Sequence, residues 1–224
     1  MRHTTAEQPG KHRTIIALAM AGVFLMAGCS SPPEAGPTNP PATVPATTAP
    51  SPASNTPPPS TSAVYKPATA QGPAENVPVP VLPDKAKEFS KEGLIAFTEY
   101  WYSTLGYAFE TGDPGPMLAI SDPGCRTCMA MKNTTEAGHA DGKWISGGKM
   151  VIQAPTSNFT QTPDGTYQAI TMARQEQVKY FRADKTLSKD LGITTAKGDI
   201  LVGAYKDGRW SAVTVEHLAG SSGT

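Results

Sequence analysis

Between residues 85 and 137 the apolar side chains recur at the spacing of helices. Within residues 85–111 they fall three or four positions apart, as on one helix face: Phe89, Gly93, Phe97, Trp101, Leu105 and Ala108. Gly112 can adopt the left-handed conformation that ends a helix. The Asp-Pro pairs at 113–114 and 122–123 each supply an N-cap residue followed by proline, a typical helix start. The pattern predicts a long helix and two short ones, the third over about residues 124–137.

After residue 139 the apolar period changes to that of strands. Residues 149–153 (KMVIQ) predict one strand, and residues 166–181, rich in β-branched and aromatic side chains, predict one or two. Residues 200–205 and 210–216 flank an Asp-Gly pair, the turn sequence most typical of a hairpin. These segments therefore predict antiparallel strands.

Two further segments complete the predicted domain. Residues 182–197 are mostly polar and predict a loop, and the glycine pair at 147–148 predicts a bend at the entry to a strand. Helices followed by antiparallel strands predict an α+β domain over residues 84–218, with a frayed C-terminus at 219–224. A long helix, two short helices and a curved sheet of four to six strands resemble the NTF2-like (cystatin-like) cone, which nuclear transport factor 2 shares with the polyketide cyclase-like enzymes.

Residues 1–28 have the pattern of an export signal. A basic segment precedes the uncharged run Ile15–Gly28, which is too short to cross a membrane as a helix. The sequence LMAGC at 25–29 resembles the lipobox of bacterial lipoproteins. This resemblance implies cleavage before Cys29 and lipidation of its sulfur by a diacylglyceryl group, with palmitate-type chains. An ordinary cleaved signal is the alternative. Lipidation predicts a protein anchored in the cell membrane on its extracytoplasmic face.

Composition and charge describe the rest of the chain. Residues 29–83 hold 16 of the 22 prolines and only three charged side chains, which predicts a disordered tether. Residues 84–218 carry 15 basic and 16 acidic side chains, so they lack the basic excess of a nucleic-acid-binding domain. We therefore expect the membrane, an envelope protein or a small apolar ligand as partners, and no nucleic acid.

The chain has three cysteines, and lipidation of Cys29 leaves Cys125 and Cys128. Outside the cytoplasm such a pair most often forms a disulfide. Two alternatives stay open. A cysteine at a helix start can be a reactive thiolate in a redox-active dithiol. With His139 the pair would supply only three zinc ligands, fewer than a structural zinc site needs. We expect neither a metal nor a cofactor.

Several short motifs resemble a known family. They are EG-x-x-AF at 92–97, YA-x-x-TGD at 107–113, the CxxC pair at 125–128 and the glycine pair at 147–148. Together they resemble a family of actinobacterial lipoproteins that share a domain of unknown function. The resemblance implies a location in the cell envelope, and it implies no catalytic residues.

An aromatic cluster on the predicted long helix is the main candidate binding site. The cluster consists of Tyr100, Trp101, Tyr102 and Tyr107, on the helix that covers the sheet in a cone fold. Aromatic side chains there can line a pocket for an apolar ligand, and the candidates are Tyr100, Trp101 and Tyr107. Alternatively, Trp101 simply fills the core.

Three functional hypotheses follow. The first is a non-catalytic binding module, which predicts that His217, Asp113 and Glu99 do not meet in a pocket. The second is a small-molecule enzyme that uses a carboxylate or a histidine in the pocket as acid or base. The third is a thiol–disulfide oxidoreductase that uses the cysteine pair.

Overall fold

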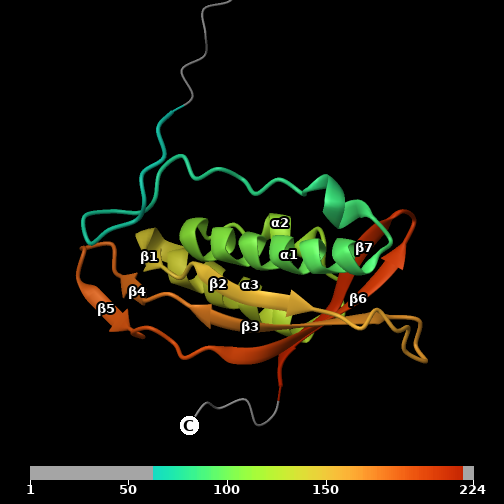
Figure 1. Cartoon of the computed structure of the whole chain (residues 1–224). Coiled ribbons are helices and arrows are strands. Elements are labelled where there is room, and N and C mark those ends of the chain that lie inside the picture. The colour runs from blue at the N-terminus through green and yellow to red at the C-terminus, as the bar shows by residue number, and fades with distance from the viewer. Residues whose placement is uncertain (1–62, 219–224) are drawn as a thin grey trace, which may run out of the picture. The chain divides into compact units, whose positions relative to one another are not determined.

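The computed structural model describes residues 63–218, and these form an α+β domain with antiparallel sheets, which confirms the predicted fold class (Figure 1). The helical elements are η1 (Asp84–Lys87), α1 (Lys91–Thr111), α2 (Gly115–Leu118), α3 (Arg126–His139) and η2 (Ala140–Gly142). The strands are β1 (Trp144–Gly147), β2 (Met150–Thr156), β3 (Tyr167–Gln175), β4 (Val178–Phe181), β5 (Leu187–Asp190), β6 (Lys197–Lys206) and β7 (Arg209–His217).

The long helix α1 is shorter at its start than the apolar pattern predicts. It begins after Ser90, whose Oγ accepts a hydrogen bond from the Gly93 backbone N–H at 3.0 Å. Residues 84–87 instead form the separate 3-10 turn η1, because the N-cap at Ser90 requires an extended backbone between the two elements. At the other end Gly112 has a φ of 78°, which confirms the predicted left-handed stop.

The two Asp-Pro pairs lie just before the short helices, but the prediction that the aspartates are the N-cap residues is wrong, because the N-cap residue is Pro114 for α2 and Cys125 for α3. The Asp113 carboxylate accepts from the Gly115 backbone N–H at 2.8 Å, and the Asp122 carboxylate accepts from Gly124 at 2.7 Å. The loop after Asp122 continues to Cys125, which caps α3. These local bonds fix where α2 and α3 lie beneath α1.

The strands form two sheets, whereas the apolar pattern predicts a single curved one. The larger sheet has the order β2-β3-β6-β7 and the smaller one β1-β4-β5. Gly147 and Gly148, with φ values of 82° and 84°, separate β1 from β2, which confirms the predicted bend. A Cβ at Gly147 would lie 1.9 Å from the Gln177 carbonyl oxygen. Only glycine therefore allows the chain at the end of β1 to approach the backbone before β4 this closely.

The sequence pattern does not predict two of the strands, β1 and β5. The prediction of a loop over residues 182–197 is wrong for β5, whose four residues are all exposed and therefore show no apolar alternation. Strand β1 has only four residues and pairs with β4. By contrast, the hairpin of β6 and β7 is confirmed, with Lys206 opposite Arg209 at its turn.

The core lies between α1 and one face of the larger sheet (Figure 1). Leu94, Phe97 and Trp101 of α1 are fully buried against it. Near the start of α1 an aromatic cluster packs together, with ring centroids 4.7–6.4 Å apart: Phe89, Phe97, Phe159, Tyr167, Tyr205 and Trp210. This cluster fills one end of the space under the helix. Within residues 63–218 no helix is long and apolar enough to span a membrane.

Residues 63–83, which we call the strap, belong to the folded domain and not to the predicted tether. The Trp144 indole N–H donates to the Thr69 carbonyl at 2.8 Å, and the Ser146 hydroxyl donates to the Ala68 carbonyl at 2.8 Å. Composition misplaced this boundary because the strap is ordered by contacts with β1 and α1, together with pairing of Lys66 with Glu75 inside the strap. The residues predicted as signal, lipidated cysteine and the rest of the tether lie outside the described range.

Candidate functional site

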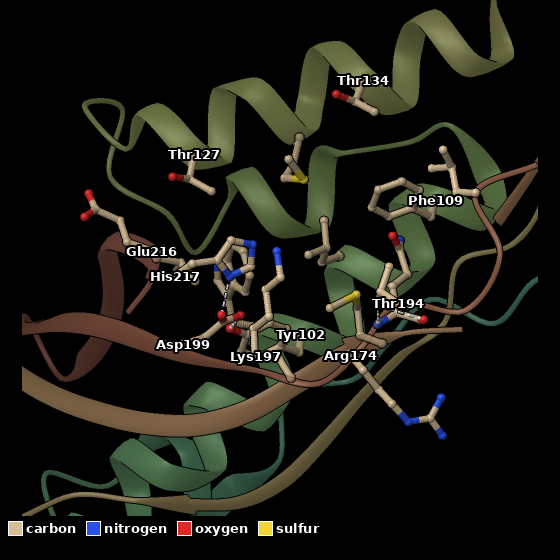
Figure 2. Close-up of a pocket in the computed structure, with 18 of the residues that line it drawn as sticks. Tyr102, Phe109, Thr127, Thr134, Arg174, Thr194, Lys197, Asp199, Glu216 and His217 are labelled. Atoms are coloured by element: carbon tan, nitrogen blue, oxygen red, sulfur yellow. Dashed lines mark hydrogen bonds and ion pairs between the residues drawn. The ribbon is translucent and has the colours of Figure 1, made fainter. Parts of the chain in front are cut away.

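A cavity of about 380 Å³ lies beside the C-terminal half of α1 (Figure 2). Its walls come from α1, α3, the larger sheet and the chain between β5 and β6. Seven large apolar side chains line it: Trp101, Leu105, Phe109, Met131, Met150, Leu191 and Val215. The sequence builds this space because the helical repeat of α1 directs large side chains inward. The opposing strand β3 offers the small Ala173.

A hydrogen-bonded series of three polar side chains crosses one wall of the cavity (Figure 2). The Tyr102 hydroxyl on α1 donates to Asp199 Oδ2 on β6 at 2.7 Å. The other oxygen of this carboxylate bonds to Nδ1 of His217 on β7. An ionised carboxylate can only accept, so Nδ1 of the imidazole donates this bond, and in the neutral ring the lone pair lies on Nε2.

Burial differs sharply along this series. Asp199 is 4% exposed, whereas the His217 side chain is 66% exposed. Burial, followed by the hydrogen bond to Asp199, raises the pKa of Tyr102 far above the usual range, so this hydroxyl stays protonated as a donor. Tyr102 therefore holds the carboxylate from the protein interior, and His217 meets it from the solvent side.

A β-bulge brings Asp199 and His217 together. From the turn inward, Gly203 pairs with Ala212, but Val202 pairs with Thr214, so the extra residue Val213 shifts the register by one. Beyond the bulge Asp199 lies directly opposite His217. Without this residue Asp199 would face Glu216, because a slip of one position exchanges the faces of a strand.

Charged and hydroxyl side chains surround the mouth of the cavity. Lys197 is directed into the cavity beside His217 (Figure 2), and Glu216 and Thr127 lie nearby. Arg174 also belongs to the lining, but its guanidinium is directed away from the cavity (Figure 2). The result is an apolar interior with one anchored imidazole and one ammonium group at its opening.

The three aromatic residues predicted to line a pocket are not brought together. Trp101 is buried in the cavity wall, where its indole N–H donates to Ser121 Oγ at 2.9 Å. Tyr107 lines a separate groove beneath the strap. The Tyr100 hydroxyl donates to the Pro80 carbonyl at 3.4 Å, and this residue lines neither space. Only Trp101 therefore contributes to the cavity.

The three titratable residues singled out from the sequence do not converge either. His217 lies at the cavity, whereas Asp113 bonds to the Gly115 backbone N–H before α2 and Glu99 is exposed on α1. Sequence reasoning missed Asp199 as the partner of His217. A signal was present, because Asp199 alternates with the buried Leu201 and so lies on the inward face of β6.

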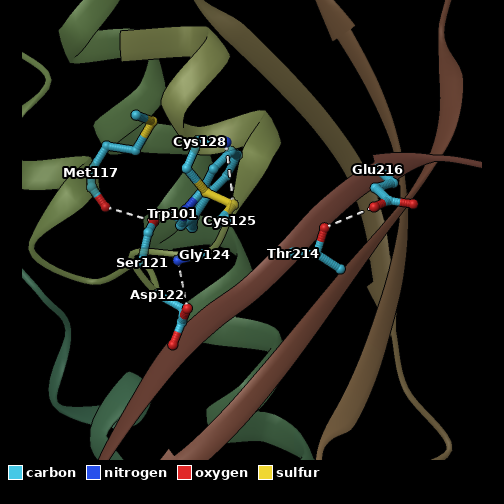
Figure 3. The surroundings of a disulfide bond; sticks show 9 residues. All are labelled: Trp101, Met117, Ser121, Asp122, Gly124, Cys125, Cys128, Thr214 and Glu216. Atoms are coloured by element: carbon cyan, nitrogen blue, oxygen red, sulfur yellow. Dashed lines mark hydrogen bonds between the residues drawn. A yellow bond between two sulfur atoms is a disulfide. The ribbon is translucent and has the colours of Figure 1, made fainter.

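The structure joins Cys125 and Cys128 by a disulfide at the start of α3 (Figure 3). Both residues are 0% exposed, and the Cys128 backbone N–H donates to Cys125 Sγ at 3.2 Å. His139 lies at the far end of α3, where Nδ1 bonds to the Thr135 carbonyl at 2.9 Å. Among the residues that the structure describes, no group of three or more His, Cys, Asp or Glu side chains is placed to hold a metal ion.

Solved structures give only distant similarities. The protein Aln2 from a Streptomyces species is 14% identical, with a TM-score of 0.37, and the match covers 58% of this chain and 93% of that one. The intermembrane space region of chloroplast protein ARC6 is 11% identical, with a TM-score of 0.42 and coverages of 59% and 99%. A cystatin-like protein of unknown function from Nostoc punctiforme is 10% identical, with a TM-score of 0.28 and coverages of 58% and 94%. At these TM-scores the similarities carry no argument about function.

Sequence comparison is more informative. No curated protein matches the chain significantly. A family model described as a family of unknown function, DUF6318, matches residues 63–216. The matched segment starts with the strap, includes Tyr102 and Asp199, and ends one residue before His217. Because this match covers more than half of the sequence, the chain belongs to the DUF6318 family.

Proposed function

We propose that the domain is a binding module for a small, largely apolar molecule, held in the cavity beside α1. The observation that carries this proposal is the cavity itself. Its volume of about 380 Å³ and its lining by seven large apolar side chains match the character of small-molecule sites. The polar series at its mouth provides a few directed groups that can orient a ligand with one polar end.

The size of the cavity limits the class of ligand. Small-molecule sites usually span about 300 to 1,000 Å³. This cavity lies near the lower end of that range, which favours a compact ligand of up to three rings over a long acyl chain. A fitting ligand would place its apolar part against Phe109 and Met131 and its polar end near His217 and Lys197.

We also propose that Cys29 carries the diacylglyceryl anchor and holds the domain at the extracytoplasmic face of the cell membrane. The resemblance of LMAGC to a lipobox supports this, and two acyl chains are what stable anchoring needs. Metabolic labelling with a fatty-acid probe tests it. Label should enter the wild-type chain and not Cys29→Ala. Equal labelling of both would contradict the anchor.

Binding is tested with the full-length chain and N-phenyl-1-naphthylamine, an apolar dye that fluoresces when it leaves water. Thr134 lies on the cavity-facing side of α3, whereas its neighbour Asn133 is exposed and lines no part of the cavity. The variant Thr134→Phe should fill the cavity and weaken dye binding at least about tenfold. The matched control Asn133→Phe should bind the dye like the wild type.

Two results would contradict the binding proposal. Equal dye affinity in Thr134→Phe and wild type would place the dye elsewhere on the molecule. Equal loss in both variants would show a general effect of the added ring on α3. Thermal unfolding of each variant establishes that it is folded.

Burial argues against a role in thiol–disulfide exchange. Reactive cysteines lie in partly exposed, electropositive surroundings, whereas Cys125 and Cys128 are fully buried. A partner thiol cannot reach either sulfur without opening the start of α3. The disulfide therefore fits a structural role better than a redox one.

A further inference from the structure

We propose that His217, positioned by Asp199, is a general base that removes a proton from a carbon atom of the bound molecule. This inference rests on the proposed function, because its substrate occupies the same cavity. The substrate class is a compact carbonyl compound with an acidic C–H next to the carbonyl group. Lys197 faces the carbonyl oxygen in this arrangement.

The first argument is the fixed direction of the imidazole. Asp199 accepts the Nδ1 proton of His217, and this leaves Nε2 as the basic atom. No hydrogen bond to Nε2 is found within residues 63–218, and the residue lines the cavity. A carboxylate behind an imidazole fixes its tautomer and stabilises the imidazolium that forms when it takes a proton.

The second argument is the cost of burying the carboxylate. An ionised group in the interior is unfavourable unless it is paired and hydrogen-bonded. Tyr102 satisfies Asp199 from the core, yet the remaining oxygen is directed at a histidine that is mostly solvent-exposed and buries little surface. An asparagine or threonine at position 199 would join the strands at lower cost. The arrangement therefore fits a chemical role better than a packing role.

The proposed step balances without any cofactor or oxidant. Nε2 of His217 takes the proton, and the C–H electron pair forms a carbon–carbon double bond. The carbonyl oxygen becomes an enolate oxygen, whose negative charge the Lys197 ammonium stabilises. The imidazolium then returns the proton to the same carbon or to a conjugated one. The net reaction is proton exchange or a shift of the double bond.

The test uses 5-nitrobenzisoxazole as a probe of a base in an apolar site. Loss of its C3 proton breaks the N–O bond and releases 2-cyano-4-nitrophenolate, which absorbs visible light. The full-length chain should open this ring faster than an equal concentration of free imidazole by about 100-fold, because general bases in proteins commonly contribute 10² or more. His217→Gln should remove this acceleration.

Asp199 is tested as a positioning residue. Asp199→Asn should lower kcat about tenfold or more while changing KM less than about twofold, because it misdirects the imidazole without narrowing the cavity. His139→Gln is the matched control, since this histidine lies at the far end of α3 and does not line the cavity. It should keep the wild-type rate.

Each outcome decides a separate claim. A wild-type rate equal to that of free imidazole, or a full rate in His217→Gln, would overturn the acid–base inference. If the naphthylamine dye still binds in that case, the binding proposal stands. Absence of dye binding together with ring opening that depends on His217 would support the catalytic inference and limit the cavity to ligands smaller than the dye. A change in Asp199→Asn confined to KM would make this residue part of binding only.

Discussion

Replacing Tyr102 by phenylalanine removes one oxygen atom from the inner end of the polar series and leaves the rest of α1 unchanged. The lost hydroxyl is the donor to Asp199 Oδ2 at 2.7 Å. Because the carboxylate is 4% exposed, water cannot easily replace this donor. The only remaining hydrogen-bond partner of the carboxylate side chain among the described residues is the imidazole of His217.

The size of the effect follows from the kind of bond. A hydrogen bond to a charged group contributes about 1.5–3 kcal/mol, and loss of one partner of a buried acceptor lies in the upper part of that range. We therefore expect Tyr102→Phe to lower the free energy of unfolding by about 2–3 kcal/mol. For a domain of this size each kcal/mol lowers Tm by roughly 2–4 °C. The Tm should fall by about 4–12 °C.

Differential scanning calorimetry of the full-length chain measures this change. Tyr107→Phe is the matched control, since it makes the same substitution on the same helix. Its hydroxyl has no hydrogen bond within the described residues, and it should change stability by less than about 0.5 kcal/mol. Equal losses of Tm in the two variants would refute the assigned role of the Tyr102–Asp199 bond. A Tm unchanged in Tyr102→Phe would do so as well.

Three further predictions concern the helix ends and the strap. Gly112→Ala should lower the free energy of unfolding by about 1–3 kcal/mol, because φ is 78° and the new Cβ would lie 2.6 Å from the His139 ring. Chemical denaturation measures this change, and an unchanged midpoint would contradict it. The double variant Cys125→Ala/Cys128→Ala should lower the free energy of unfolding by less than about 2 kcal/mol, because a disulfide that closes so short a loop removes little entropy from the unfolded chain. Dye binding should persist in this variant. The hydrogen bond to Glu110, followed by burial, raises the pKa of Tyr65 from 10.0 to about 12. A raised pKa stabilises the folded state fully below pH 10, and this contribution is lost as pH rises through about 12. Tyr65→Phe should therefore lose less stability than the wild type over that interval, and parallel curves for the two would argue against the bond.

The helices and the last hairpin could be predicted because their signals are local. The stop at Gly112, the turns at Asp113 and Asp122, and the turn at Asp207-Gly208 act through residues close in sequence. The glycine pair before β2 was predictable for the same reason, since a positive φ favours glycine.

The remaining features depend on contacts between distant segments. The strap has the composition of a tether, and it is ordered by bonds to distant residues, among them Trp144, Ser146 and Glu110. Strand β5 is exposed on both faces and pairs only with β4, so no apolar period marks it. Tertiary contacts override composition in both cases.

Of the two paired residues of the candidate site, only His217 could be predicted from the sequence. His217 was a candidate because histidines are rare in this chain, but its partner depended on the register of β6 and β7. The pattern of the hairpin, counted outward from Asp207-Gly208, places Glu216 opposite Asp199. The bulge at Val213 changes that pairing, and nothing in the apolar alternation indicates it.

A crystal structure of the full-length chain grown with saturating N-phenyl-1-naphthylamine tests the central claim most directly. The account predicts electron density for the dye beside α1, in contact with Phe109 and Met131 and next to the ring of His217. Density only on the exposed face of the larger sheet, or an unoccupied cavity under these conditions, would contradict it.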